Sequence, residues 1–273
     1  MADVERAVAA RDGTSLAVLE AGQGAPILLL HGLTATRRYV VMGSRLLERS
    51  GRHVVAYDAR GHGRSAPAPT PQAYGYDLLA EDLESVLDDL EIERATLAGA
   101  SMGAHTIARF ALAYPQRVAA AALITPAFDP AAHGDFAGWD ALARGLREGG
   151  VEGFVDAYDL ASLPDRWQET VRTVLRQRLG AHEHPAAVAD ALEVVPRSRP
   201  FESMQELSQI AAPTLVVASR DESDPEHPLV VGERWAQAIP GARLLVEQPG
   251  ASPIAWQGGQ LSRALLELAD GVS

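Results

Sequence analysis

A serine between two glycines is the clearest chemical feature of this sequence. Ser101 lies in the pattern Gly99-x-Ser101-x-Gly103, after the short apolar run 95–98 and before a segment, 102–114, that is expected to be helical. A sharp turn from strand to helix holds such a serine in a strained conformation, and the glycines let the strand and the helix approach closely. Backbone N–H groups at the start of the helix favour negative charge, which suits an oxyanion beside an attacking hydroxyl. The pattern therefore predicts a nucleophilic serine.

Strands that would position this serine are predicted on both sides of it. Residues 4–10 and 16–20 flank the turn signal Asp12-Gly13, which predicts an antiparallel hairpin. Continuous apolar runs at 26–31, 53–58, 118–125 and 213–219 are typical of strands buried on both faces of a parallel sheet. A further strand is predicted at 242–247, and helices are predicted at 39–50, 76–90 and 256–270. This alternation indicates an α/β fold, with a mostly parallel central sheet and helices on both faces.

The segment 127–200 interrupts the alternation, because it contains no strand-like run. Helical stretches are predicted there at 139–147, 151–160, 166–179 and 185–194. We therefore expect a core formed by residues 1–126 and 201–273, with residues 127–200 as a helical cap insertion. Arg172, Arg176 and Arg178 lie on one of the predicted cap helices. A solvated helix face is the simpler interpretation of these arginines, and an anionic ligand is the alternative.

The composition excludes several classes of function. A formal net charge of −12 at pH 7 argues against nucleic acid and against anionic membrane surfaces as partners. The absence of cysteine excludes disulfides, thiolate metal sites and a catalytic thiol. Because no metal-ligand spacing, phosphate loop or dinucleotide fingerprint is found, we expect no metal and no cofactor. The N-terminus lacks the layout of a signal peptide and no apolar run has the length of a membrane span, so we expect a cytoplasmic protein. A small-molecule substrate or ligand is the expected partner, and a homo-oligomer is left open.

Four segments occur in an order that points to a known family. They are His31-Gly32, Asp58-x-Arg60-Gly61-His62-Gly63-x-Ser65, the Ser101 pattern, and Pro213-Thr214-Leu215-Val216-Val217. With these segments the sequence resembles the α/β-hydrolase fold superfamily over nearly its whole length. Members are mostly hydrolases of esters, lactones, amides or C–C bonds, and they also include cofactor-free perhydrolases, lyases and hormone receptors. In this resemblance the segment 127–200 would be the cap over the site.

The resemblance implies a role for individual residues. Ser101 would be the nucleophile, and the backbone N–H groups of Leu33 and Met102 would form the oxyanion hole. The acid would follow the strand 215–218, where Asp224 is preferred over Asp221 because it lies four residues before a proline, Pro228. His31 and His62 are expected to be structural residues that shape their loops.

The sequence departs from the superfamily at the catalytic base. The base is usually a histidine in the loop after the last strand, but here that loop carries Ala251 or Ser252 at the corresponding position. Neither side chain can take a proton from a serine near neutral pH. No histidine follows His227 in the chain.

Three interpretations stay open. In the first, another histidine supplies the base, with His227 and His133 favoured over His105, His182 and His184. In the second, the protein binds a small molecule, or performs slow or non-hydrolytic chemistry, with the same pocket. In the third, the chain is a hydrolase whose histidine was replaced deliberately. The sequence favours α/β-hydrolase-type chemistry on a small ester, lactone or related carbonyl compound, with a catalytically weak binding protein on the same scaffold as the alternative.

Overall fold

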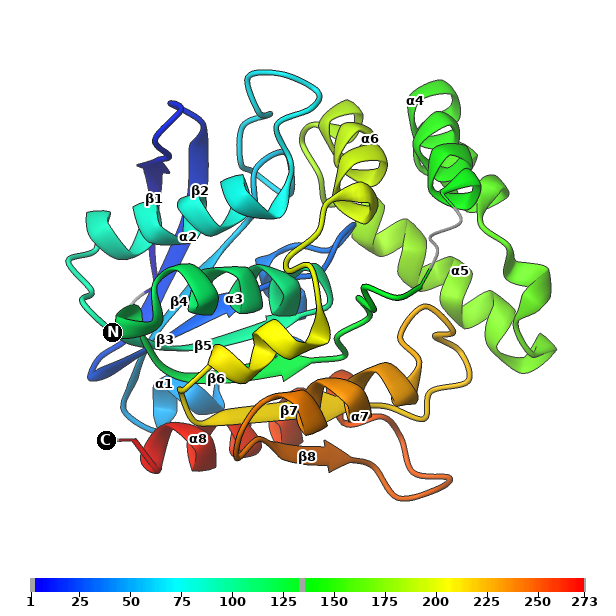
Figure 1. The fold of residues 1–273 in the computed structure, drawn as a ribbon. Helices are drawn as coiled ribbons and strands as arrows, with labels where there is room; N and C mark the ends of the chain where they lie inside the picture. Colours follow the sequence, from blue (N-terminus) through cyan, green and yellow to red (C-terminus); the bar gives the residue numbers. More distant parts are fainter. Residues whose placement is uncertain (1–2, 133–135, 273) are drawn as a thin grey trace.

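The computed structural model describes residues 3–132 and 136–272 of the 273-residue chain. Within these residues the strands form one eight-stranded sheet in the order β1-β2-β4-β3-β5-β6-β7-β8 (Figure 1). The first two strands are antiparallel to their neighbours, and the strands from β4 to β8 in this order are parallel to one another. The strand bounds are β1 (Val4–Ala9), β2 (Ser15–Gly22), β3 (Ala25–Leu30), β4 (Arg52–Tyr57), β5 (Ala95–Ala100), β6 (Val118–Ile124), β7 (Thr214–Ala218) and β8 (Arg243–Val246).

Helices cover both faces of this sheet, which explains why its central strands are continuously apolar. On β3, Leu28 and Leu30 pack into one core with the helices α2 (Tyr76–Asp89), α3 (Met102–Ala113) and α7 (Leu229–Ala238). The alternate residues Ile27 and Leu29 face the other core, with α1 (Leu46–Arg49) and α8 (Gly258–Asp270). Side chains alternate between the faces of a strand, so a strand buried on both faces needs apolar residues throughout. The predicted fold class, α/β with a mostly parallel central sheet, is confirmed.

The prediction of one helix over residues 39–50 is wrong. The structure forms a short 3₁₀ helix, η1 (Arg37–Tyr39), and later the single turn of α1. Between them Met42 has φ 47° and Gly43 has φ 72°. Left-handed backbone at two successive residues cannot continue a right-handed helix.

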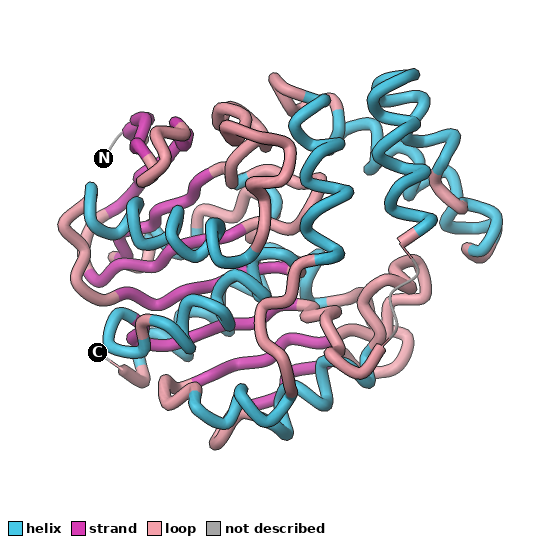
Figure 2. The backbone as a smooth tube through the Cα atoms, turned by 45° about the horizontal axis from the view of Figure 1, so that its top comes forward, coloured by secondary structure: helices cyan, strands magenta, loops and turns pink. Residues whose placement is uncertain are grey.

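The described part of 127–200 forms helices, which lie together at one end of the sheet (Figures 1 and 2). Their bounds are α4 (Ala137–Ala157), η3 (Leu160–Ser162), α5 (Asp165–Leu179), α6 (Pro185–Val194) and η4 (Val195–Arg197). They share an apolar cluster of their own that includes Leu146, Phe154, Leu179 and Val188. Gly150, with φ 61°, interrupts α4 at the predicted boundary between two helical stretches. The division of the chain into a core and a cap at residues 126 and 200 stays a prediction.

The remaining short elements are 3₁₀ turns, namely η2 (Pro115–Arg117), η5 (Met204–Gln209) and η6 (Ile254–Trp256). Among the helices in the described ranges, none combines the length and the apolar character needed to cross a membrane.

Candidate active site

Ser101 sits in a strained turn between β5 and α3. Its backbone has φ 50° and ψ −111°, a region that a residue other than glycine rarely adopts. The glycines of the pattern allow this turn to lie tightly against the sheet. A Cβ atom added to Gly99 would lie closer than 3.0 Å to the backbone of Gly103, and one added to Gly103 would lie closer than 3.0 Å to the backbone of Leu30. The geometry therefore presents the serine hydroxyl at the carboxyl end of a central strand.

The loop after β3 lies directly against the Ser101 turn. A Cβ atom added to Gly32 would be 3.3 Å from the Cβ of Ser101, so the next residue, Leu33, lies beside the serine. His31 shapes this loop, because its Nδ1–H donates to the Gly32 carbonyl (2.8 Å) and its Nε2 accepts from the Ala59 N–H (2.9 Å). These two bonds confirm the structural role expected for His31.

The first turn of α3 places backbone N–H donors beside the serine. Met102 is the first residue of α3, and N–H groups in the first turn of a helix have no partner within the helix. The Met102 side chain itself is buried. Leu33 and Met102 thus flank Ser101 from two different segments, as two donors of an oxyanion hole would.

A cavity of about 790 Å³ opens above Ser101 at the carboxyl ends of the parallel strands. Loops after β3, β5, β6, β7 and β8 line it on one side, and α5 lines it on the other. Four of the predicted site residues line this cavity together with the substituted position Ala251; they are Leu33, Ser101, Asp224 and His227. His133, the other histidine favoured as a base, lies outside the described residues.

Asp224 and His227 form a hydrogen-bonded pair in the loop that follows β7. The Asp224 Oδ1 and His227 Nδ1 atoms are 2.7 Å apart, and the side chains are 21% and 19% exposed. Burial on its own raises the pKa of Asp224, but the interactions with His227 and Arg178 outweigh it and hold the pKa below its ordinary value. An ionised carboxylate only accepts hydrogen bonds, so Nδ1 of His227 carries the proton. The other ring nitrogen, Nε2, then carries a lone pair that can accept a proton.

Asp221, the less favoured acid, has a different set of partners. Its carboxylate accepts from the Ser223 N–H (2.9 Å), the Ser223 hydroxyl (2.7 Å) and the indole N–H of Trp256 (2.7 Å). These bonds tie the loop after β7 to the turn η6. Of the two carboxylates, Asp224 is therefore the one paired with a histidine.

Ala251 occupies the loop after β8, exposed at the rim of the cavity. Its backbone N–H donates to the Gln248 carbonyl at 2.9 Å, which closes a tight turn. The side chain is a methyl group and offers no proton acceptor.

The other described histidines with a bearing on catalysis are held in structural positions. His105 is buried behind Ser101, where its Nε2 accepts from the backbone N–H groups of Ala127 (3.0 Å) and Phe128 (3.1 Å). His182 accepts from the Gly63 N–H at 2.8 Å and donates to the Thr34 carbonyl at 2.9 Å. These hydrogen bonds engage the imidazoles of His105 and His182, so neither histidine is free to exchange a proton with Ser101.

Arg178 is the residue whose position the sequence did not predict. Arg172 and Arg176 do lie on the solvated face of α5, paired with Glu169 and Glu152. Arg178 follows Arg176 by two residues, or about 200° around the helix axis, and so points the other way. Its side chain lines the cavity.

Two aromatic rings contact the Arg178 guanidinium. Its central carbon lies 5.5 Å from the centroid of the Tyr39 ring and 4.9 Å from that of Trp256. The Nε atom is buried and has no hydrogen-bond partner among the described residues. Burial lowers the pKa of this guanidinium, and the Asp224 charge is the main influence that opposes it.

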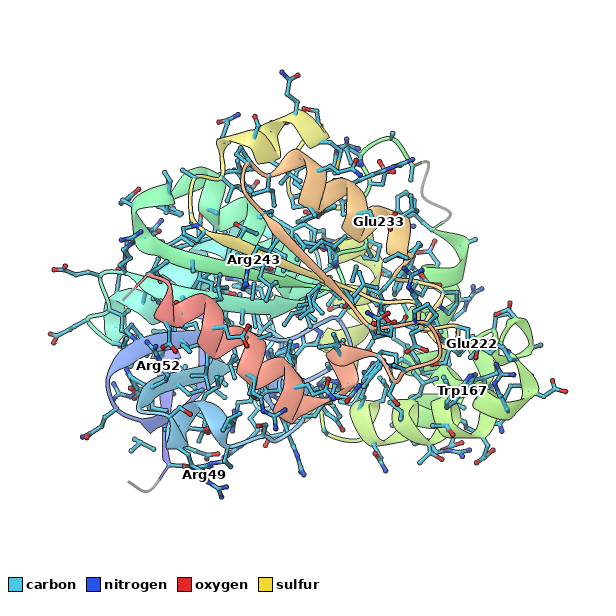
Figure 3. All side chains as sticks on the ribbon, turned by 90° about the horizontal axis from the view of Figure 1, so that it is seen from below. Arg49, Arg52, Trp167, Glu222, Glu233 and Arg243 are labelled. Atoms are coloured by element: carbon cyan, nitrogen blue, oxygen red, sulfur yellow. The ribbon has the colours of Figure 1, made fainter. Side chains whose placement is uncertain are left out.

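One ion pair and one hydrogen bond join α5 to the loop that carries Asp224. Glu222 accepts from the Arg166 guanidinium and from the indole N–H of Trp167 (3.2 Å), and both partners belong to α5 (Figure 3). Trp167 and Glu222 also line the cavity. The loop with the Asp224–His227 pair is thus held from the side of the helical segment.

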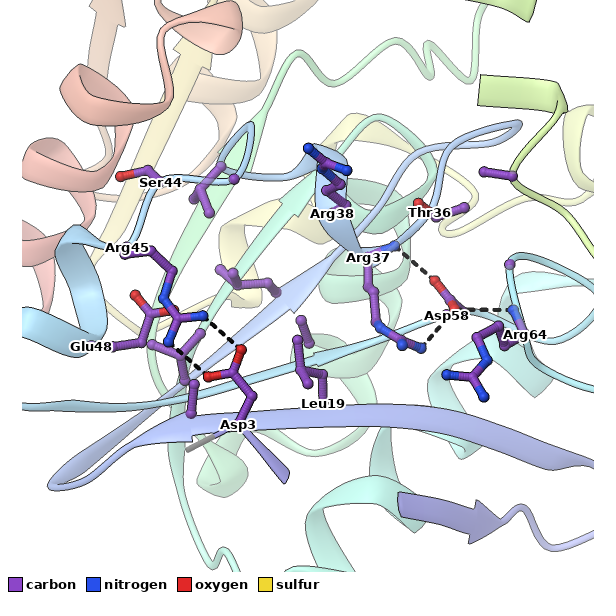
Figure 4. A pocket seen from close by; sticks show the side chains of 18 residues that line it. Asp3, Leu19, Thr36, Arg37, Arg38, Ser44, Arg45, Glu48, Asp58 and Arg64 are labelled. Atoms are coloured by element: carbon purple, nitrogen blue, oxygen red, sulfur yellow. Dashed lines mark hydrogen bonds and ion pairs between the residues drawn. The ribbon is translucent and has the colours of Figure 1, made fainter. Parts of the chain in front are cut away.

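A second cavity, of about 500 Å³, lies on the far side of the β3–η1 loop (Figure 4). Several of its charged groups are paired with one another. Asp58 accepts from the backbone N–H of Arg37 (2.8 Å) and from its guanidinium (2.8 Å), and Asp3 binds Arg45 at 2.6 and 2.7 Å. These pairs give Asp58 and Arg37 structural roles. In the described residues no group of three or more His, Asp or Glu side chains is arranged to hold a metal ion.

Comparison with known proteins agrees with this architecture. The family model described as the alpha/beta hydrolase fold matches residues 25–258. A 2-hydroxy-6-oxononadienedioate/2-hydroxy-6-oxononatrienedioate hydrolase from Pseudomonas putida is 32% identical over 237 residues, which are 82% of this chain and 80% of that protein. The non-heme chloroperoxidase CPO-A1 of Kitasatospora aureofaciens is 26% identical and matches 94% of this chain and 96% of its own. A crystal structure of a hydrolase from Pseudomonas aeruginosa PA01 superposes with a TM-score of 0.77 at 27% identity, covering 97% of this chain and 98% of that one.

The family model covers far more than half of the sequence, and its match includes the Ser101 turn, the loop after β3 and the loop with the Asp224–His227 pair. The sheet order and the helices on both faces agree with it. The chain belongs to the α/β hydrolase fold family.

Proposed function

We propose that the protein hydrolyses a small carbonyl compound, an ester or a lactone, with Ser101 as the nucleophile. The observation that carries this proposal is the hydrogen-bonded pair Asp224–His227 in the cavity that Ser101 lines. A nucleophile, an imidazole and a carboxylate that orients it are the three parts of a serine hydrolase. The Pseudomonas putida relative, named as a hydrolase of a carbonyl-bearing dioate, supports the reaction class.

In this proposal His227 takes the place of the histidine that the family carries after its last strand. Its Nε2 accepts the Ser101 proton while the oxygen of the serine attacks the substrate carbonyl. The backbone N–H groups of Leu33 and Met102 stabilise the oxyanion of the tetrahedral intermediate. His227 then protonates the leaving alkoxide, and a water molecule, deprotonated by the same imidazole, releases the acid and regenerates the serine.

Asp224 supports each of these steps by holding Nδ1–H of His227. The carboxylate fixes the tautomer, so that Nε2 is the acceptor, and it stabilises the imidazolium that forms after proton transfer. The segment 127–200 acts as the cap, because α5 forms the wall of the cavity opposite the Ser101 turn.

A small-molecule binding protein on the same scaffold is the second candidate. Ala251 favours it, because the loop after β8 offers only a methyl group at the rim of the cavity. Without an imidazole near Ser101, the oxyanion hole and substrate binding alone give a rate roughly 1,000- to 10,000-fold higher than that of the uncatalysed reaction in water.

Hydrolysis of 4-nitrophenyl butyrate separates the two candidates. We expect the unaltered protein to turn this ester over, Ser101→Ala to abolish turnover, and His227→Gln to lower kcat by about 100- to 10,000-fold. His184→Gln changes a half-buried histidine that does not line the cavity, and serves as the matched control with unchanged activity.

Two outcomes would contradict parts of the proposal. Full activity of His227→Gln, with activity still dependent on Ser101, would exclude His227 as the base. An inactive native protein that gains activity through Ala251→His would support the binding protein in place of the hydrolase.

A further inference from the structure

We infer that the cavity above Ser101 binds a ligand with a carboxylate group, and that Arg178 recognises this group. As a statement about the substrate, the inference rests on the proposed hydrolase function. As a statement about binding, it follows from the surroundings of Arg178 alone.

The guanidinium of Arg178 lies over two aromatic rings. Tyr39 and Trp256 approach it as aromatic rings, at 5.5 and 4.9 Å from their centroids. Aromatic rings attract a guanidinium through its flat face and do not accept its in-plane N–H groups in the way a carboxylate does. These two ring contacts therefore do not supply the oxygen acceptors that the N–H groups of Arg178 prefer.

One of these donors is buried without an acceptor. Nε of Arg178 has no hydrogen-bond partner within the described ranges 3–132 and 136–272. A buried donor without a partner costs free energy, and its presence is explained when a ligand supplies the acceptor. The cavity that Arg178 lines has room for such a ligand, with a volume of about 790 Å³.

The charge of Arg178 is incompletely balanced within the protein. The carboxylate with the main influence on it, Asp224, is hydrogen-bonded to His227 and not to Arg178. Burial lowers the pKa of this guanidinium, which is the direction expected of a partly buried cation without a direct counterion. A bound anion would restore this balance.

The geometry of the donors matches a carboxylate. Nε and one terminal nitrogen of an arginine present two parallel N–H groups, which match the two oxygens of a carboxylate. The same helix, α5, also lines the cavity with the apolar side chains of Val171, Val174 and Leu175. We therefore expect a substrate with a short apolar chain between its carboxylate and the carbonyl that Ser101 attacks.

Binding is measured first, without turnover. The probe is monomethyl glutarate, and its uncharged counterpart is dimethyl glutarate, each titrated calorimetrically into Ser101→Ala. We expect the anionic probe to bind about 10- to 100-fold more tightly than the neutral one, the range of a charge-assisted hydrogen bond. Arg178→Gln on the Ser101→Ala background should remove this preference, and Arg178→Lys should retain part of it. Arg176→Gln, an exposed arginine on the same helix, is the matched control and should leave the preference intact.

Equal binding of the two probes, no binding of the anionic probe at millimolar concentration, or a preference that survives in Arg178→Gln would overturn the inference. Unfolding curves of Arg178→Gln and Arg178→Lys, compared with the Ser101→Ala parent, distinguish a lost contact from a lost fold.

Kinetics of two esters separate this inference from the proposed function. We expect Arg178→Gln in the Ser101 protein to lower kcat/KM for mono-4-nitrophenyl glutarate about 10- to 100-fold more than it lowers kcat/KM for 4-nitrophenyl butyrate. The control Arg176→Gln should leave both values unchanged. If neither ester is hydrolysed but the anionic probe still binds through Arg178, the hydrolase proposal fails and the carboxylate site stands. If both esters are hydrolysed equally well by Arg178→Gln and by the native protein, the hydrolase stands and the carboxylate site is refuted.

Discussion

His105 is expected to make the folded protein sensitive to acid. It is buried on α3, one turn after Ser101. Nε2 accepts two backbone N–H groups, from Ala127 and Phe128, so Nδ1 carries the proton and donates to the Tyr76 oxygen at 2.8 Å. A second proton would have to occupy Nε2, directly opposite two donors. Protonation therefore breaks both bonds and buries a charge.

The size of this effect follows from the change in proton affinity on folding. Burial, with a smaller contribution from the His227 charge, lowers the pKa of His105 from 6.5 to about 3. Between these values the unfolded chain binds a proton that the folded protein does not, so stability is present above pH 6.5 and is lost as the pH falls. One pKa unit corresponds to about 1.4 kcal/mol, which gives roughly 5 kcal/mol over the whole window and about 2 kcal/mol between pH 7 and pH 5.

Urea unfolding at pH 7, 6 and 5, followed by circular dichroism, measures this contribution. The variant His105→Gln keeps an amide near the two N–H donors but does not titrate. We expect it to be less stable than the native protein at pH 7, and to lose about 2 kcal/mol less between pH 7 and pH 5. His184→Gln is the matched control and should lose stability in parallel with the native protein. If His105→Gln also loses stability in parallel with the native protein, His105 does not titrate as the buried position requires, and the reasoning is refuted.

Two further predictions concern the Ser101 turn and the acid. Gly103→Ala should destabilise the fold by about 3 kcal/mol, because its Cβ would meet the Leu30 backbone, whereas Gly138→Ala, with open space around it, should have little effect on the melting temperature. Asp224→Asn should lower kcat for 4-nitrophenyl butyrate by about 100- to 10,000-fold with a small change in KM, because an amide no longer fixes the tautomer of His227. A kcat within a few-fold of the native value would show that Asp224 does not orient the base.

Features encoded by neighbouring residues were predictable from the sequence. The β1–β2 hairpin is predicted by the turn signal Asp12-Gly13. The Ser101 turn is predicted by two glycines, which allow a tight connection from strand to helix. The hydrogen bond between Asp224 and His227 also joins residues three positions apart, so the sequence could bring them to the same loop. In these cases the physical cause lies within a few residues of its effect.

Features that depend on distant segments were not predictable in the same way. The sequence predicts a helix between η1 and α1, but Met42 adopts a left-handed conformation that its residue type does not predict. The sequence predicted a solvated position for Arg178, because Arg178 shares one helix with Arg172 and Arg176. Its true surroundings come from Tyr39 and Trp256, which lie far away in the chain and meet it only in the folded protein.

The position of the acid explains how a hydrolase of this family could function without a histidine after β8. The carboxylate of a triad acts by holding Nδ1–H of the imidazole, and this contact does not depend on the segment that supplies the ring. Asp224 makes this contact with His227, which belongs to the same loop. Asp221 connects that loop to Trp256, and Glu222 connects it to α5. Acid and base then belong to one loop, which these contacts connect to its surroundings. A histidine introduced at Ala251 would compete with His227 for the same carboxylate, so we expect Ala251→His to gain little activity, or to lose some, wherever His227 is the working base.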